Sequence, residues 1–146
     1  QLLQQQLLQA QRTDTSIQLE PAGEHYLIAA TLNEQHDVNL LIDTGASTSV
    51  LSQAKFDELQ AWQEAEFISE QEIFTAGGIV NAPIYRFSQF QIDDIQVADL
   101  YFVILDLPDR RSDGLLGMNF LKQFRFHIDQ QNARLELSPR RPADNP

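Results

Sequence analysis

The 146-residue chain contains no cysteine, and this absence removes two classes of site. Without thiols there can be no disulfide framework and no thiolate-bound metal, and the redox compartment cannot be inferred. The three histidines, His25, His36 and His127, are scattered, and no two of them have the close spacing of a helix-borne zinc site. We therefore expect no metal and no other cofactor.

Basic residues are also scarce, with 10 Lys and Arg against 21 Asp and Glu and a formal net charge of −11. Such a chain repels phosphate backbones, so nucleic acid is not expected as a partner. No apolar run approaches the roughly 18 residues of a membrane-spanning helix, so this segment is not expected to enter a membrane. The chain begins with Gln1 rather than Met, and we expect a signal or a membrane anchor to be missing upstream.

Length and composition favour one domain, because 146 residues with 42% hydrophobic side chains bury a single sizeable core. Residues 1–16 are rich in Gln and Leu and are expected to form a linker or, alternatively, a partner-binding or dimerising helix. The domain is expected over residues 17–138, with a disordered tail over 139–146. The sequence contains no internal repeat, so no second, similar half is expected in this chain.

Short apolar stretches separated by polar turns favour β-strands along most of the domain. The expected turns are residues 33–37, 76–78 and 93–94, and a last hairpin is expected to pair residues 124–129 with 134–138. Ser52 is expected to cap a short helix over residues 53–62, and a second short helix is expected after Gly117. The pattern predicts an all-β fold with one or two short helices.

One motif indicates chemistry. The strand-like run 38–42 ends in Asp43, Thr44, Gly45, Ala46 and Ser47. An aspartate at the end of a buried strand is held on rigid backbone, and the following glycine permits a tight turn. The Thr44 hydroxyl and the turn amides can hydrogen-bond the carboxylate. By itself such a tripeptide is typical of an ordinary β-turn, but a second signature, residues 114–117, follows about seventy residues later and favours a catalytic aspartate.

In LLIDTGASTSVLS and DGLLGMNFL the chain resembles the retropepsins, the retroviral-type aspartic proteases, and especially their bacterial relatives. The resemblance spans roughly residues 17–138 and implies a closed, mostly antiparallel, barrel-like β domain. It implies that Asp43 is catalytic and that Leu115, Leu116 and Gly117 pack behind the catalytic loop. It also implies that a hairpin tip is the flap over bound peptide, namely Thr75, Ala76, Gly77, Gly78 and Ile79. The alternative is a glycine-rich turn without substrate contact.

Aspartic proteolysis needs two carboxylates that share a proton and a water molecule. As is established for this class of enzyme, one carboxyl is neutral while the other is charged. This chain supplies one such motif, because Asp14-Thr15-Ser16 lacks the glycine and is expected to lie in a polar linker. A symmetric homodimer is therefore expected, with a peptide or protein as substrate.

Met118 departs from the resemblance, because many retroviral enzymes have a basic residue there, and the interleaving terminal segments of viral dimers have no clear counterpart. A retropepsin-fold binding or dimerisation module with little or no proteolysis is thus the alternative. A serine nucleophile at Ser47 or Ser49 is disfavoured, since no Gly-x-Ser-x-Gly turn accompanies it. The apolar candidates Ile79, Val80, Leu115 and Leu116 suggest hydrophobic residues beside the cut bond. The cell location is not determined; the bacterial resemblance suggests a periplasmic or membrane-anchored protein.

Overall fold

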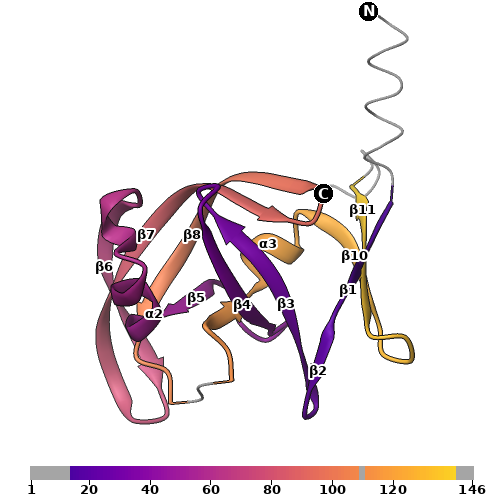
Figure 1. Ribbon diagram of the computed structural model, residues 1–146. Helices are drawn as coiled ribbons and strands as arrows, with labels where there is room; N and C mark the ends of the chain where they lie inside the picture. The colour runs from indigo at the N-terminus through magenta and orange to yellow at the C-terminus, as the bar shows by residue number, and fades with distance from the viewer. Residues whose placement is uncertain (1–13, 109–110, 141–146) are drawn as a thin grey trace, which may run out of the picture.

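A computed structural model describes residues 14–108 and 111–140 and shows a mostly β architecture (Figure 1). The strands are β1 (Thr15–Gln18), β2 (Glu20–Ala22), β3 (His25–Leu32), β4 (His36–Ile42), β5 (Ser49–Ser52), β6 (Glu66–Thr75), β7 (Gly78–Ile92), β8 (Ile95–Leu105), β9 (Gly114–Leu116), β10 (Phe124–Asp129) and β11 (Arg134–Pro139). The helices are α2 (Gln53–Glu58), the 3₁₀ helix η1 (Ala61–Gln63) and α3 (Met118–Leu121). None of the helices among these residues has the length and apolar character needed to cross a membrane.

Eight strands form the larger sheet in the order β2-β3-β4-β9-β5-β8-β7-β6, and an additional pairing of β3 with β7 curls it back on itself. Most neighbours are antiparallel; the parallel pairs are β4 with β9 and β5 with β8. The predicted closed, mostly antiparallel β fold is thus confirmed. The short strand β9 lies between β4 and β5. It therefore pairs with the strand before and the strand after the loop that joins β4 to β5.

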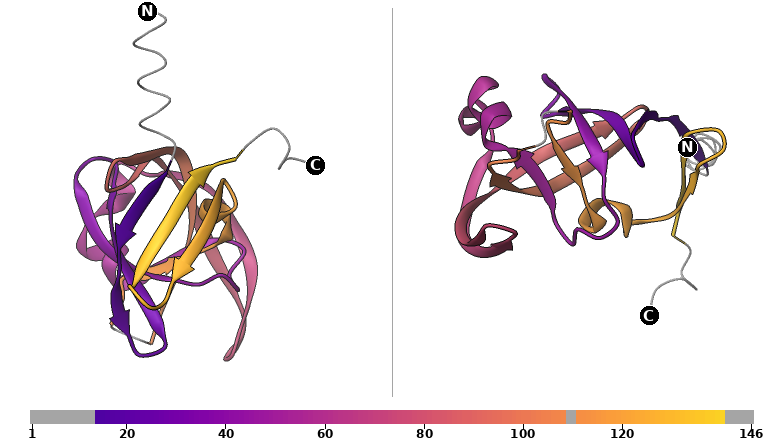
Figure 2. Two further views of the ribbon diagram at one scale, coloured as in Figure 1. Left: turned by 90° about the vertical axis from the view of Figure 1, so that its right-hand side faces the viewer. Right: turned by 90° about the horizontal axis from the view of Figure 1, so that it is seen from below.

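A smaller, three-stranded sheet joins the two ends of the described chain in the order β1-β11-β10 and faces the viewer in the left view of Figure 2. The prediction that Asp14-Thr15-Ser16 lies in a linker is wrong, because β1 begins at Thr15 and pairs with β11. The Arg134 side chain donates hydrogen bonds to the Ser16 hydroxyl and carbonyl, and Ser138 donates one to Asp14. The predicted helix or linker over 1–16 and the predicted tail over 139–146 otherwise lie largely outside the described residues.

The hydrophobic core divides between the two faces of the larger sheet. The main core is centred on four fully buried phenylalanines, Phe87, Phe90, Phe102 and Phe120. A smaller cluster, which we call the second cluster, contains Val50, Ala82, Ile84 and Val103 as its buried members. Strands β5, β7 and β8 supply residues to both clusters, and in β5 the adjacent Val50 and Leu51 do so by pointing to opposite faces.

Both predicted helices are present. Ser52 caps α2, since its hydroxyl accepts a hydrogen bond from the Lys55 amide at 3.0 Å, and Phe56 anchors the helix in the main core. The second helix, α3, follows Gly117 directly. The predicted polar turns also connect the expected strands, and Asn33 and Asp93 adopt the left-handed backbone that such turns favour. Local sequence signals therefore determine most element boundaries.

Backbone contact at Gly114 holds β9 in its place. A Cβ atom built on Gly114 would lie 2.0 Å from the Val50 carbonyl oxygen, a distance that no side chain can occupy. Only glycine lets β9 approach β5 this closely. The pairing of β9 with β5 thus requires glycine at position 114.

We predict that Gly114→Ala destabilises the fold by about 3 kcal/mol or more, because the added methyl must push β9 away from β5. The measurement is urea unfolding followed by circular dichroism. Gly77→Ala is the matched control, since a Cβ there would meet only the Thr75 hydroxyl, at 3.9 Å. Equal stability of the two variants would contradict the assigned role of the close approach.

Candidate active site

Asp43 follows the last residue of β4 and is fixed mainly by backbone hydrogen bonds. Its amide donates to the Leu116 carbonyl at 3.0 Å, which extends the parallel β4–β9 ladder by one step. The Gly45 amide donates to the Asp43 Oδ1 atom at 2.9 Å, and the Ala46 amide closes the turn onto the Asp43 carbonyl. The carboxylate is half-buried and the Thr44 side chain is exposed. One carboxylate oxygen is thus held by the turn.

The second signature lies directly behind this loop. The Met118 amide donates to the Ala46 carbonyl at 2.8 Å, and a Cβ on Gly117 would lie 2.8 Å from both the Ala46 and the Thr48 carbonyl oxygens. Glycine is therefore needed at 117 for the backbones to meet. Leu116 is fully buried in the main core, so the chain on either side of it is anchored.

Ser49 and Asn119 form a hydrogen-bond network behind this loop. The sequence alone did not reveal this structural role for either residue. Asn119 accepts hydrogen bonds through its Oδ1 atom from the Ser49 amide (2.9 Å) and hydroxyl (2.7 Å), and it donates through Nδ2 to the Tyr101 carbonyl. The Ser49 hydroxyl in turn accepts from the Gly117 amide at 3.0 Å. This network links the end of the loop that carries Asp43 to β8 and α3. The Ser49 hydroxyl is buried and already bonded, which further disfavours Ser49 as a nucleophile.

Asp113 is a second support that the sequence did not reveal. Its carboxylate accepts from the Asn39 amide and its own amide donates to the Asn39 carbonyl, both at 2.8 Å. Its carbonyl also accepts from the Ser52 amide at 2.8 Å. Asp113, which directly precedes β9, is thus bonded to both β4 and β5. These bonds hold β4, the strand that leads to Asp43, in position.

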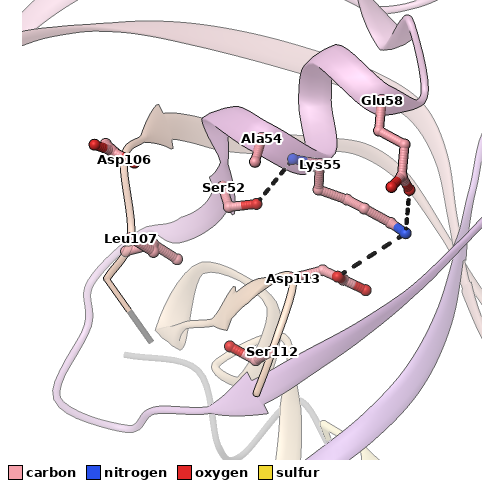
Figure 3. Close-up of a pocket in the computed structure, with 8 residues that line it drawn as sticks. All are labelled: Ser52, Ala54, Lys55, Glu58, Asp106, Leu107, Ser112 and Asp113. Atoms are coloured by element: carbon pink, nitrogen blue, oxygen red, sulfur yellow. Dashed lines mark hydrogen bonds and ion pairs between the residues drawn. The ribbon is translucent and has the colours of Figure 1, made fainter. Parts of the chain in front are cut away.

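A cavity of about 180 Å³ adjoins this support, and Figure 3 shows its lining, with Lys55 between Glu58 and Asp113. The Lys55 ammonium lies 2.7 Å from Glu58 and 4.0 Å from Asp113. The hydrogen bond to Glu58 raises the pKa of Lys55, with further contributions from the charges of Asp113 and Glu58 that outweigh its partial burial. Lys55 therefore remains charged at acidic and neutral pH. Asp43 does not line this cavity.

Strands β6 and β7 form a long hairpin that ends in the predicted flap segment. Thr75 pairs with Gly78 across a two-residue turn, and the Thr75 hydroxyl donates to the Gly78 carbonyl at 2.8 Å. Gly78 has a φ of +118°, a backbone conformation that side chains rarely permit. The hairpin is as predicted; its role as a flap stays a prediction. The tip is largely exposed, with Phe74 at 82% of its maximal accessible surface.

An apolar row crosses the sheet on the same face as Asp43. Leu41 lies on this face by strand alternation and pairs with Leu115, which pairs with Val50, and Val50 pairs with Val103 and Val103 with Ile84. Leu115 and Ile73 pack against the second cluster. Leu116 was one of four apolar residues expected to contact substrate. It points to the opposite face, into the main core, because adjacent residues of a strand point to opposite sides. That expectation was wrong.

Comparison with known proteins agrees with this geometry. The sequence profile of the family described as "gag-polyprotein putative aspartyl protease" matches residues 28–123. The chain belongs to this retropepsin-like aspartic protease family. A comparison with curated proteins found no significant match.

Two solved structures show the same fold as this retropepsin-like chain. One is the crystal structure of a retropepsin-like aspartic protease from Rickettsia conorii, with a TM-score of 0.60 and 22% identity over 85% of this chain and 89% of the other. The other is EIAV protease complexed with the inhibitor HBY-793, with a TM-score of 0.56 and 21% identity over 70% and 90%. At these identities the likeness establishes the fold.

The retropepsin-like chain replaces an expected basic residue with Met118. The Met118 side chain packs against the main core, while its backbone amide keeps the bond to Ala46. Support of the loop that carries Asp43 therefore comes from backbone bonds and from the neutral Ser49–Asn119 pair.

We predict that Asn119→Ala lowers stability by about 1–3 kcal/mol, because the part-buried Ser49 amide loses its acceptor. Thermal or urea unfolding measures this loss. Asn81→Ala, in the exposed part of β7, is the control and should be nearly neutral. An Asn119→Ala variant as stable as the parent would show that the network does not support the loop.

Proposed function

We propose that this chain is one subunit of an aspartic endopeptidase, in which two copies each supply one Asp43. The observation that supports it most directly is the placement of that carboxylate: a strand end fixed to Leu116 and a turn amide from Gly45 hold it within a segment that matches aspartyl proteases. The chain itself has one such motif. The second carboxylate must then come from a second copy.

The proposed chemistry divides the work between the two carboxyl groups. The ionised Asp43 acts as general base on a water molecule, which attacks the peptide carbonyl, while the neutral Asp43 of the second copy polarises that carbonyl. The Gly45 amide holds one oxygen of each carboxylate, which leaves the other oxygen for the water and the shared proton. No covalent enzyme intermediate is formed. The rigid loop supplies preorganisation, so little reorganisation is needed during the reaction.

Substrate preference follows from the apolar row beside Asp43. Leu115 and the second cluster offer hydrophobic surface on the catalytic face. Val80 pairs with Ile73 and therefore shares its side of the hairpin, whereas Ile79 pairs with Phe74 on the other side. We therefore propose that hydrophobic residues flank the cleaved bond and that Val80, rather than Ile79, contacts them.

We predict that Asp43→Asn abolishes cleavage of a mixed peptide library assayed from pH 3 to 7, because an amide cannot act as the general base. The loss should be at least about a thousandfold in kcat/KM. Asp14→Asn is the matched control, since that aspartate lies in the superficially similar Asp14-Thr15-Ser16 segment and an amide oxygen can still accept from Ser138.

The same assay at several protein concentrations tests the need for two copies. Activity per subunit should fall on dilution, because association follows mass action. Cleavage that survives in Asp43→Asn would rule out the proposed chemistry. A complete lack of cleavage by the parent would favour a binding or dimerisation module.

We predict that the cleaved library peptides carry aliphatic or aromatic residues beside the cut, preferred over charged ones by about tenfold or more, since burying an unpaired charge is costly. Val80→Ser should weaken this preference, and Ile79→Ser should leave it nearly unchanged. Mass spectrometry of the cleavage products measures the preference of the parent and of both variants. A preference for charged flanking residues would refute the assignment of the apolar row.

A further inference from the structure

Strand β6 forms one edge of the larger sheet. Among residues 14–108 and 111–140 it pairs with β7 and with no other strand, and the pairing is regular from Ser69 to Thr75, beyond the bulge after Phe67. Figure 1 shows the β6–β7 hairpin at the left margin of the molecule, across from β1, β10 and β11. An unpaired edge carries amide and carbonyl groups that can pair with an added strand. The open edge of β6, which we call the β6 edge, is therefore available to a partner.

The register of the hairpin shows which backbone groups face the β6 edge. Thr75 flanks the two-residue turn, where paired residues exchange hydrogen bonds, and such pairs alternate with non-bonded pairs along antiparallel strands. Glu70, Glu72 and Phe74 therefore occupy the alternate positions, and their amides and carbonyls point away from β7. The pairing of Glu70 with Pro83 agrees with this assignment, because proline has no amide to donate to β6.

The side chains of the same residues determine what the β6 edge can bind. They lie on the face of the hairpin opposite Ile73, where Glu70 and Glu72 are exposed and form no ion pair within the described part of the chain. On this face Phe74 is 82% exposed, and Ile79, which pairs with it, is 57% exposed. Carboxylates alone would only protect an edge, but an exposed apolar pair beside them indicates a surface that a partner covers.

Charge decides between the occupants of the β6 edge. A second copy is disfavoured, since its own β6 would bring carboxylates beside carboxylates, and like charges directly opposite each other destabilise strand pairs. The whole chain has a formal net charge of −11, so its field attracts positively charged partners. A strand that carries Lys or Arg at alternate positions would place these cations opposite Glu70 and Glu72 while its backbone pairs with β6.

We propose that the β6 edge binds an extended, basic segment of a partner protein as an added strand. Basic side chains of this segment lie opposite Glu70 and Glu72, and an apolar side chain covers Phe74 and Ile79. These side chains point away from the face that carries Asp43 and the second cluster, because Ile73, which packs against that cluster, lies on the other side of the hairpin. Docking therefore leaves the face proposed for substrate free.

A labelled synthetic peptide of about ten residues that alternates Lys with Val tests the proposal, since this length matches the longer strands of proteins. Fluorescence anisotropy measures its binding to the full chain carrying Asp43→Asn, which keeps the probe from being cleaved. The peptide should bind at least about tenfold more tightly than a version with Glu in place of Lys, and added salt should weaken its binding. Methyl groups on the backbone nitrogens of the lysines keep the charge but remove the amide donors, and should also weaken binding at least about tenfold.

A double variant, Glu70→Lys with Glu72→Lys, locates the site, and Glu20→Lys with Glu24→Lys is the matched control. Both double variants change the net charge equally at exposed positions, but the control residues lie in and beside β2, the opposite edge of the larger sheet. The Lys-Val peptide should lose at least about tenfold in affinity for the first variant and less than about threefold for the second. The first variant should instead bind the Glu-Val peptide, a gain that a misfolded protein would not show.

Each other outcome overturns the proposal. Equal affinity of the Lys-Val peptide for the two double variants would show that the β6 edge is not the docking surface. Equal affinity of the methylated and unmethylated peptides would show that charge attraction alone holds the probe and that no strand is added. No binding of the Lys-Val peptide to the chain with its glutamates intact would show that the edge does not take a basic strand.

Discussion

The close backbone approach of β9 to its neighbours is the constraint on which the site depends. At Gly114 and Gly117 an added Cβ would lie 2.0 Å and 2.8 Å from backbone carbonyl oxygens. Because these two residues have no side chain, β9 fits between β4 and β5 and its last carbonyl reaches the Asp43 amide. The position of the carboxylate is therefore determined by main-chain geometry. Backbone fixes a functional group more firmly than a flexible side chain does.

The three residues of strand β9 include adjacent leucines that face opposite sides of the sheet. Leu116 points into the main core and is fully buried, while Leu115 points to the same face as Asp43 and packs against the second cluster. A substitution at 116 is thus expected to act on folding, and one at 115 on substrate. Asp113 and Asn119, on either side of the strand, tie its ends to Asn39 and Ser49.

Short-range patterns explain why most of the fold could be predicted. Alternating apolar strands, polar turns and the Ser52 cap are local signals, and the run from Asp43 to Ser47 is contiguous. The misses were long-range. Ser16 bonds to Arg134, 118 residues away, and no local signal marks such a pair. The bond between Ser49 and Asn119 spans 70 residues and is equally invisible in the sequence. Leu116 was misplaced because the signature alone does not say which of two adjacent leucines faces the core.

The smaller sheet of β1, β11 and β10 completes the core within one subunit. Ile17, Leu135 and Leu137, which come from the two ends of the described chain, are buried in the main core of one subunit. Since these strands pair within the subunit, its core is completed without a partner, whereas the pair of carboxylates proposed for catalysis needs a second copy. Under the proposed function, the activity would therefore depend on subunit concentration, whereas the fold of each subunit would not.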